Sequence, residues 1–572
     1  MATLAVGTVA LTGSVRQKGA ESRPEWVLQI PAGPGNPRNS EGDFAVLKDG
    51  SVLYVYTHFN GASGADEAPA HLASRVSHDG GVTWTAKDHV EMKCDGKLNV
   101  MSVSLLRLKD GRLALFYLRK DDAMADCNPV MRTSSDEGKT WSAPTVCIPE
   151  GERSYYVLNN GRAIQTKAGR IVLPLAKHHG KEGYDLNGRL TTALSDDGGR
   201  TWRMGKDCFQ TFSPYDDSRV STQEPGVIEL KDGRLMMWAR TLEGVQYVTF
   251  SSDGGDTWTR AVPWNLLSPN SPASVIRLST GDLCAIWNDH GANFEIKIKQ
   301  WSEKAIGHGA YGMRTPLTIA LSKDEGRTWI KRRNLEAGVS SEPCYAAMEE
   351  VSGKLLLAYF AWESQGIGIR MASVPLDYLY GSERDEDQSG ILPKLYARAV
   401  VRIDISDAEG RNYSPDDPMM TNFVNCAPAP VSWCPEGNRV CAEFGPARRG
   451  GKWQDYRFSF TPRFDGKFTF CLMGEHGEKT VYDDFRVTGA KLLNAGFESD
   501  EPAWTGPSVG PGTEANSDVA KPFGIVGKWR RNLPAEGKRM AVCSHALIMN
   551  QTVRLTKGVP VTVSFKATTW QR

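Results

Sequence analysis

Short apolar runs on either side of a glycine turn recur six times in the first two thirds of the chain. Two of the copies read FAVLKDGSVLYVY and GVIELKDGRLMMWA. The pattern predicts β-hairpins, because glycine readily supplies the positive φ that a tight turn needs. The six turn glycines are Gly50, Gly111, Gly169, Gly233, Gly281 and Gly353.

An octapeptide of the form S-x-D-[DEG]-G-x-T-W follows each of the first five hairpins. A fixed element that recurs about every 60 residues indicates a repeat architecture. We interpret the octapeptide as a structural staple, in which Ser and Asp bond the backbone of their own turn, Gly is left-handed and Trp packs between strands. The copies span residues 77–84, 134–141, 195–202, 251–258 and 322–329.

One repeat unit then contains a hairpin, a third strand that runs into the octapeptide, and a fourth strand. Six such units predict a six-bladed β-propeller over residues 25–380. The sixth unit lacks an octapeptide, and residues 366–376 supply its third strand. Residues 25–31 form a spare strand, which we expect to complete the sixth unit and cover its open edge.

The remainder of the chain completes an all-β prediction. Residues 381–395 are charged and contain Gly and Ser, which is typical of a linker. Residues 396–572 show short alternating runs that predict a β-sandwich. Residues 1–24 are interpreted as a disordered tail or the remnant of a signal peptide.

Composition narrows the function without defining it. The formal net charge is +1, from 68 basic and 67 acidic residues, so no footprint for nucleic acid is expected. No long apolar stretch predicts a membrane span. The 11 cysteines include no C-x-x-C pair and no zinc-ligand spacing, so neither a metal nor a cofactor is predicted. Cys426, Cys434 and Cys441 cluster late in the chain, either as free thiols or with one disulfide.

The hairpin polarity separates two faces of the predicted ring. Gly turns and octapeptides share one face, so functional side chains are expected on the other face. There they fall about eight to 12 residues before a Gly turn, just after a second strand, or before a third strand. These windows contain Arg38, Asp66, Glu224, Arg240, Arg314 and Tyr345.

The chain resembles the sialidase (neuraminidase) family, whose repeats are called Asp-boxes or BNR repeats. The five octapeptides match that motif over about residues 25–380. EPGVIELKDGRLMMWAR reproduces a family pattern in which a Glu, here Glu224, precedes an Arg, here Arg240, across a Gly-turn hairpin. The C-terminal third resembles carbohydrate-binding jelly-roll modules, either two with the last incomplete or one permuted.

The resemblance implies site residues at matching positions. Arg314 matches an Arg before a late Asp-box strand, Tyr345 matches the Tyr that opens the last hairpin, and Asp66 resembles the Asp before the first Asp-box. The usual Arg-Ile-Pro start is absent, because Gln29 stands where that Arg is expected. We take Arg38 as its substitute.

The family relationship implies a retaining exo-α-sialidase, secreted or periplasmic, that acts on terminal sialic acids of glycans. Three arginines suit the substrate carboxylate, and a neutral Tyr345 avoids like-charge repulsion as nucleophile. Glu224 is then the base and Asp66 the acid/base, with Glu67, Glu41 and Glu342 as rival carboxylates. Two other hypotheses stay open: an enzyme for another acidic sugar, and a non-catalytic glycan-binding protein.

Overall fold

The structure is a computed structural model and is almost entirely β. It describes residues 23–214, 219–290, 314–336, 341–381 and, with gaps, 400–569. Within these residues, helix is confined to α2 (Leu376–Tyr380) and a 3₁₀ turn at Glu150–Glu152. The predicted tail and the predicted linker lie almost wholly outside the described residues. The gaps between 400 and 569 are 410, 412–419, 428–431, 437–438, 447–451, 475–478, 500–502, 505–523, 528–532 and 544–548.

Four sheets of the first 381 residues each contain four antiparallel strands. The first is β2 (Asn39–Val46), β3 (Val52–Phe59), β4 (Ala70–Ser77) and β5 (His89–Met92). The second is β6 (Asn99–Arg107), β7 (Leu113–Lys120), β8 (Cys127–Ser134) and β9 (Thr145–Val146). The third is β19 (Ser274–Arg277), β20 (Leu283–Asn288), β21 (Leu317–Ser322) and β22 (Ile330–Glu336). The last is β23 (Cys344–Val351), β24 (Lys354–Glu363), β25 (Gly366–Pro375) and β1 (Glu25–Ile30).

The third and fourth predicted units are joined in one nine-stranded sheet. The expectation of six separate four-stranded units is therefore not met at this point. The link is one residue pair, Gly188 with Thr222, formed because β13 is long enough to reach β15. The strands are β10 (Tyr156–Val157), β11 (Ile164–Gln165), β12 (Ile171–Gly180), β13 (Gly183–Ser195), β14 (Arg203–Met204), β15 (Thr222–Glu229), β16 (Leu235–Thr241), β17 (Val245–Ser251) and β18 (Val262–Leu267).

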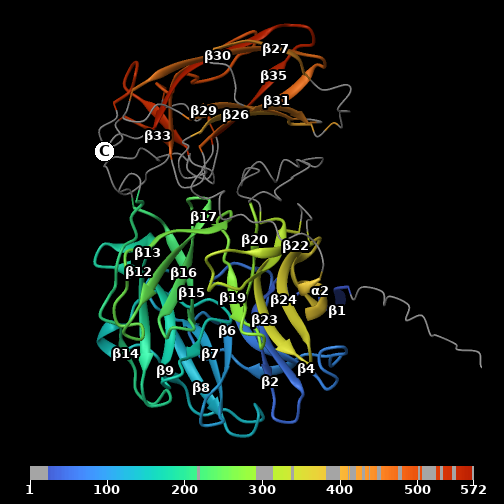
Figure 1. Cartoon of the computed structure of the whole chain (residues 1–572), viewed down its shortest axis with the longest axis vertical. Helices are drawn as coiled ribbons and strands as arrows, with labels where there is room; N and C mark the ends of the chain where they lie inside the picture. The colour runs from blue at the N-terminus through green and yellow to red at the C-terminus, as the bar shows by residue number, and fades with distance from the viewer. Residues whose placement is uncertain are drawn as a thin grey trace, which may run out of the picture.

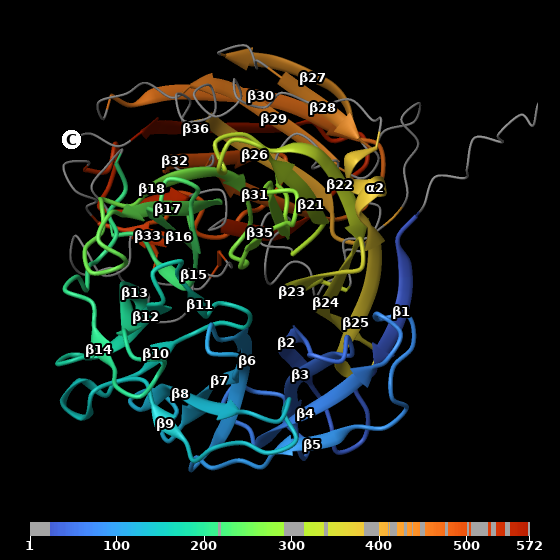
Figure 2. The same ribbon diagram turned by 60° about the horizontal axis from the view of Figure 1, so that its bottom comes forward.

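The sheets lie side by side around a common centre in the view of Figure 2. The predicted hairpins are confirmed, since the strands flanking each turn pair antiparallel. The six turn glycines all have positive φ, between 77° and 99°. The expected N-terminal strand is confirmed too, because β1 pairs with β25 and Ile30 lies opposite Ile369.

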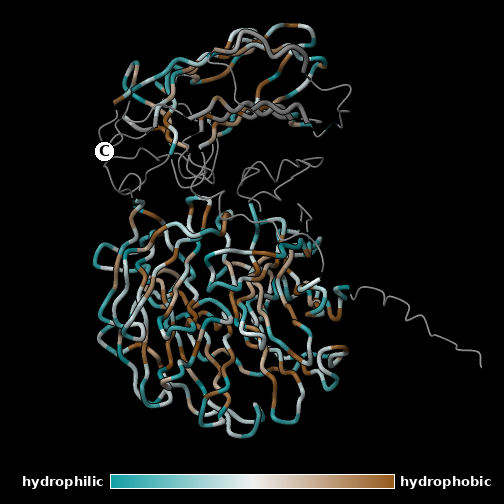
Figure 3. The backbone as a smooth tube through the Cα atoms, in the orientation of Figure 1, coloured by the Kyte–Doolittle hydropathy of each residue, from teal (hydrophilic) through white to brown (hydrophobic). Residues whose placement is uncertain are grey.

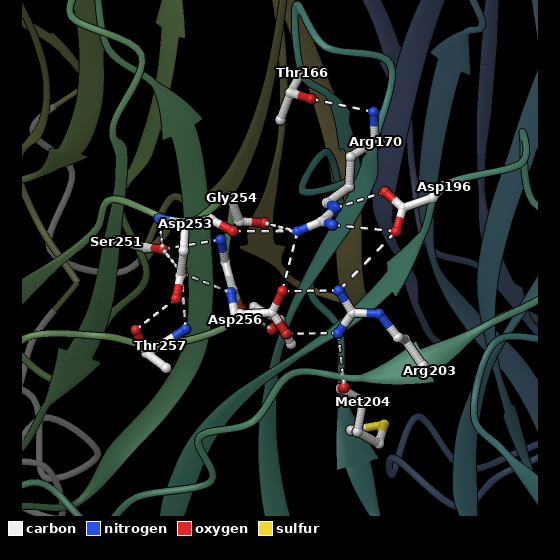
Figure 4. A network of polar contacts seen from close by, with 12 residues as sticks. Thr166, Arg170, Asp196, Arg203, Met204, Ser251, Asp253, Gly254, Asp256 and Thr257 are labelled. Atoms are coloured by element: carbon white, nitrogen blue, oxygen red, sulfur yellow. Dashed lines mark hydrogen bonds and ion pairs between the residues drawn. The ribbon is translucent and has the colours of Figure 1, made fainter.

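The octapeptide acts as the predicted staple within its own turn. Ser251 Oγ accepts a hydrogen bond from the Gly255 N–H at 2.9 Å. Asp253 accepts from the Thr257 N–H at 2.9 Å and from its hydroxyl at 2.7 Å (Figure 4). The Ser-to-Gly contact recurs in all five copies at 2.8–2.9 Å.

Four of the five octapeptides also contact the hairpin turn of the neighbouring unit through polar contacts of their own. Arg170, which follows Gly169, donates to the Gly254 carbonyl at 3.3 Å and pairs with Asp256 at 3.2 Å (Figure 4). The staple therefore stabilises both its own turn and the contact between adjacent repeat units. Similar contacts join Glu137 to Lys48, Gly198 to Arg112 and Glu325 to Lys231.

Helix α2 occupies the place where the sixth octapeptide is missing. The Tyr380 hydroxyl donates to Asp282 Oδ2 at 2.9 Å and lies 2.7 Å from Thr280 Oγ1, beside the fifth turn glycine, Gly281. On β23 of the same sheet, Glu350 accepts from the Ser279 N–H at 2.6 Å. The sixth unit thus contacts its neighbour without an octapeptide.

The C-terminal third contains two sheets that share one apolar core. Phe468 and Phe470 from one sheet pack in the same cluster as Phe458, Phe460 and Val563 from the other. Strands before residue 474 pair with strands after residue 548, so the described strands form one unit (Figure 1, orange to red). The sheets are β28 (Ser432–Glu436), β29 (Arg439–Pro446), β26 (Val400–Asp407), β31 (Gly466–Met473) and β35 (Met549–Leu555), and β27 (Met420–Ala427), β30 (Gln454–Pro462), β36 (Val561–Thr569), β32 (Thr480–Thr488), β34 (Met540–Cys543) and β33 (Gly524–Val526).

Apolar side chains of the first 381 residues pack between adjacent sheets. One cluster joins Tyr54 of β3 to Leu356 of β24, and another joins Leu53 of β3 to Val103 of β6. Figure 3 accordingly shows brown stretches along the strands and teal stretches along many turns. No helix in the described part of the chain is long and apolar enough to cross a membrane.

We expect Ser251→Ala to lower the free energy of unfolding by about 1–3 kcal/mol, because the buried Gly255 N–H loses its acceptor. Ser252→Ala is the matched control, since Ser252 is the exposed neighbour in the same turn. Urea unfolding of the two variants and the wild type measures the difference. Equal stability of the two variants would contradict a staple role for Ser251.

Candidate active site

Four inner strands begin with a β-bulge whose central residue has positive φ. The residues are Glu41 (49°), Ser102 (59°), Glu224 (48°) and Tyr345 (57°). The pairing register shifts at each of them. A bulge re-aims one side chain relative to the regular alternation of a strand. All four side chains line the same cavity.

That cavity has a volume of about 540 Å³ and lies at the ends of the inner strands opposite the Gly turns. Its wall contains every site residue predicted from the sequence. The predicted residues come from several strands and loops at sequence positions up to 307 apart, so only the tertiary fold gathers them. They are Arg38, Asp66, Glu224, Arg240, Arg314 and Tyr345.

Tyr345 and Glu224 are in direct contact. The Tyr345 hydroxyl donates to Glu224 Oε1 at 2.7 Å. Arg240 Nη1 donates to the same hydroxyl at 2.9 Å and lies 2.9 Å from Glu224 Oε2. Phe360 stacks on the Tyr345 ring with centroids 4.9 Å apart. The phenol is therefore fixed in position with a proton acceptor already bound.

The environment of Tyr345 opposes spontaneous ionisation. Burial raises the pKa of Tyr345, and the Glu224 carboxylate adds to this, which outweighs the opposite effects of Arg240 and Arg314. A phenol of raised pKa is a poor nucleophile without a base. Glu224 is the carboxylate at hydrogen-bond distance, and its rivals Glu41 and Glu342 also line the cavity.

Arg38 connects two carboxylates of different exposure. Its Nη2 donates to both oxygens of Glu41 at 3.2 Å, and its Nη1 donates to Asp66 Oδ1 at 2.6 Å. The Glu41 side chain is 5% exposed, whereas that of Asp66 is 65% exposed. Burial works to raise the pKa of Asp66, but Arg38, Lys120 and Arg240 together outweigh burial and the net pKa is lowered. Burial raises the pKa of Glu41 against the pull of Arg38.

Arg38 and Gln29, the residue at the expected arginine position, lie in different places. Gln29 lies on β1, where its amide donates to Glu363 Oε1 at 2.6 Å, and it does not line the cavity. Arg38 lies in the cavity wall, with its guanidinium carbon 4.5 Å from the Phe59 ring centroid. A cavity arginine is thus present although the usual motif is absent.

Arg314 approaches the site from the segment before β21. Its guanidinium carbon lies 5.4 Å from the centroid of the Tyr345 ring, within range of a cation–π contact. Its Nη1 donates to Cys344 Sγ at 3.3 Å. Arg314 and Arg240 therefore place two positive charges beside the Tyr345 phenol.

Several wall residues were not found by sequence reasoning. Gln223 orients Arg240, since its Oε1 accepts from Nε at 3.1 Å and from Nη2. Lys120 donates to the Asp66 carbonyl at 2.9 Å, and His178 stacks on Tyr184. The adjacency of Gln223 to Glu224 was one available signal. The HH pair at 178–179 suggested a place at the rim but no role, whereas no local pattern points to Lys120.

Within the described residues, no group of three or more His, Cys, Asp or Glu side chains is placed to hold a metal ion. Glu67, the alternative to Asp66, is exposed and does not line the cavity. The side chains of Cys426, Cys434 and Cys441 lie outside those the structure describes.

Comparison with known proteins places the chain in a family. The domain described as "BNR repeat-like domain" matches residues 61–356, more than half of the chain. The chain therefore belongs to the BNR repeat-like domain family. Together with the sialidases among its relatives, this match confirms the predicted resemblance to a divergent sialidase branch with BNR repeats.

The curated relatives include sialidases. That of Micromonospora viridifaciens is 26% identical over 385 residues, covering 62% of this chain and 54% of the relative. That of Bacteroides fragilis is 30% identical over 216 residues, covering 36% and 34%. The chain spans about half or less of the length of these relatives. A solved structure, a Hadza microbial sialidase, is 19% identical with a TM-score of 0.46 and covers 59% of this chain and 66% of that chain.

We expect Gly226→Ala to disturb the bulge that carries Glu224. A Cβ at this position would lie 2.3 Å from the Trp238 ring and 3.0 Å from Arg162 Nη1. Overpacking of this kind costs about 1–3 kcal/mol of the free energy of unfolding. Gly151→Ala is the matched control, because its added methyl meets nothing within 4 Å. Chemical unfolding of both variants measures the effect, and a fully stable Gly226→Ala protein would contradict this packing.

Proposed function

We propose that the protein is a retaining exo-α-sialidase that releases terminal sialic acids from glycoconjugates. We further propose a six-bladed propeller as the catalytic part and a C-terminal β-sandwich as an accessory, carbohydrate-binding part. The observation that carries the proposal is the 2.7 Å hydrogen bond from Tyr345 to Glu224 in a cavity that three arginines line. The sialidases among the relatives support the substrate class.

The three arginines suit the substrate carboxylate. A sialoside carries this carboxylate on its anomeric carbon, and guanidinium groups bind carboxylates by paired, charge-assisted hydrogen bonds. Arg38, Arg240 and Arg314 all line the cavity, and Arg240 also contacts Tyr345. Binding of the carboxylate by Arg240 therefore places the anomeric carbon close to the phenol oxygen.

The first displacement uses Tyr345 and Glu224. As the Tyr345 oxygen bonds to the anomeric carbon, its proton passes to the Glu224 carboxylate. The glycosidic C–O bond breaks, and Asp66 supplies the proton that the departing oxygen needs. A neutral phenol meets the carboxylate-bearing carbon without the repulsion that an Asp or Glu nucleophile would experience.

The second displacement reverses these roles. Asp66, now ionised, removes a proton from water, and the water oxygen bonds to the anomeric carbon. The bond from that carbon to Tyr345 breaks, and Glu224 returns its proton to the phenol oxygen. Two displacements at one carbon give net retention of configuration.

Substrate binding itself prepares Asp66 to act as an acid. In the free protein Arg38 holds the Asp66 carboxylate at 2.6 Å, and the pKa of Asp66 is lowered. A substrate carboxylate competes for the same guanidinium and brings a negative charge close to Asp66. Both changes raise the pKa of Asp66 and favour its protonated form in the complex.

Two rival functions are weighed against this one. A non-catalytic glycan-binding protein has no need for a phenol hydrogen-bonded to a carboxylate, so the Tyr345–Glu224 contact favours an enzyme. An enzyme for a different acidic sugar remains the alternative, because Gln29 departs from the usual arginine motif. Glycoconjugates lie largely outside cells, so we propose a secreted or periplasmic location.

Tyr345→Phe is expected to lower the rate by about 10³-fold or more, because it removes the nucleophile. The measurement is release of 4-methylumbelliferone from its N-acetylneuraminic acid glycoside by wild type and variant. The phenyl ring preserves the stacking on Phe360, so folding should be unaffected. A wild type that is inert on this and on natural sialosides would refute the sialidase proposal.

Proton NMR during turnover should detect the α-anomer of the released sugar first.

Asp66→Asn tests the acid and separates it from Glu67. A leaving group as acidic as 4-methylumbelliferone needs little protonation, whereas a natural sugar hydroxyl needs it fully. We therefore expect Asp66→Asn to lose about 10²–10⁴-fold on sialyllactose and much less on the aryl glycoside. Glu67→Gln should lose little on either substrate. The opposite ranking of the two variants would assign the acid to Glu67.

A further inference from the structure

Arg162 is a buried cation that lies outside the cavity and that the proposed mechanism does not use. Arg162 is only 2% exposed and does not line the cavity. Its backbone N–H donates to Ser104 Oγ at 2.9 Å. The side-chain amide of Asn160, two residues earlier, donates to the Gly42 carbonyl at 2.9 Å and to the Tyr345 carbonyl at 3.2 Å. The segment is therefore fixed to three neighbouring strands, one of which carries Tyr345.

The guanidinium extends toward the strand that carries Glu224. Its Nη1 lies 3.0 Å from the position that a Cβ at Gly226 would take, two residues after Glu224. Its carbon Cζ lies 5.7 Å from the centroid of the Trp238 ring. The lack of a side chain at Gly226 leaves the space that the guanidinium occupies.

The charges around Arg162 identify its partners. Burial lowers the pKa of Arg162 to about 10, against the opposite effects of Glu224, Asp43 and Tyr345, so the group is protonated at neutral pH. Nε and Nη2 have no hydrogen-bond partner among the described residues. A buried charge without such partners is costly unless an opposite charge compensates it. Glu224 and Asp43 are the two carboxylates that act on Arg162, with Glu224 the stronger.

Other charged and titratable groups also face Glu224, from several strands. In the free protein Arg240 and Arg314 act on it from the cavity, with Tyr345 at hydrogen-bond distance. In a substrate complex these two arginines share their charge with the substrate carboxylate. Arg162 lies outside the cavity, so the substrate does not neutralise it. The remaining groups that act on or respond to Glu224 are His178, Tyr184, Cys344 and Glu41.

We propose that Arg162 is a positioning residue that keeps Glu224 ionised in the substrate complex and so sets the lower pH limit of turnover. It contacts neither substrate nor reacting atoms and acts through Glu224. The catalytic consequence rests on the proposed function, because it assumes that Glu224 must be ionised to accept the Tyr345 proton. The electrostatic effect of Arg162 on Glu224 does not depend on that assumption.

The kinetic test compares Arg162→Met with Arg162→Lys, which differ in charge but not much in length. The pH dependence of kcat reports the substrate complex, and that of kcat/KM reports the free enzyme. We expect the acidic limb of kcat to move to higher pH by about one unit in the Met variant, with activity recovering as the pH rises. The shift in kcat/KM should be smaller, because Arg240 and Arg314 then still act on Glu224. The Lys variant should stay near wild type.

Equal losses in both variants with unmoved pH profiles would overturn the proposal and leave Arg162 a purely structural role. Arg162→Gln serves as a second neutral variant if the Met protein does not fold. The comparison remains one between charged and uncharged side chains at the same position.

A second readout does not require turnover. In protein labelled with [5-¹³C]glutamate, the Glu224 carboxyl resonance is identified by its absence from Glu224→Gln. Its titration midpoint should lie at higher pH in a neutral Arg162 variant than in wild type or Arg162→Lys. An unchanged midpoint refutes the effect of Arg162, whatever the activity. An inert wild type with a moved midpoint refutes only the sialidase proposal.

Discussion

The site depends on one backbone constraint: the left-handed bulge at the start of the inner strands. In a regular strand, the alternation of side chains between the two faces would decide where Glu224 and Tyr345 point. The bulges change that direction, and both side chains enter one cavity, where the Tyr345 hydroxyl lies 2.7 Å from Glu224 Oε1. Non-glycine residues in this conformation cost about 1–3 kcal/mol each. Glu41, Ser102, Glu224 and Tyr345 all adopt it, so the surrounding sheets must hold them there.

The opposite ends of the same strands provide that support. The octapeptides satisfy their own turns and also contact the hairpin of the adjacent unit, as Arg170 does with Asp256. Hydrogen bonds to charged groups of this kind contribute about 1.5–3 kcal/mol each. The octapeptides thus stabilise the strand ends opposite the cavity, and none of their residues lines it.

Local patterns predicted the hairpins and staples, because glycine turns and Ser/Asp side chains act within a few residues. The spacing of Glu224 and Tyr345 before their turn glycines, nine and eight residues, placed both at the cavity end of their strands. Arg162 stands seven residues before Gly169 but gave no such signal, since its significance depends on Gly226 and Glu224 of another strand. The pairing of Gly188 with Thr222 was missed for the same reason.

Charge balance links these separate features. In the free protein Arg38 is shared by a buried Glu41 and an exposed Asp66, while Arg240 is shared by Glu224 and the Tyr345 hydroxyl. A carboxylate ligand that binds these arginines must displace or repel the resident acids. Asp66 responds by becoming easier to protonate, which suits an acid. Glu224 must stay ionised to act as a base, and a cation that the ligand cannot reach favours its ionised form. Arg162 satisfies that requirement because it is buried, lies against Gly226 on the strand that carries Glu224, and is absent from the cavity wall.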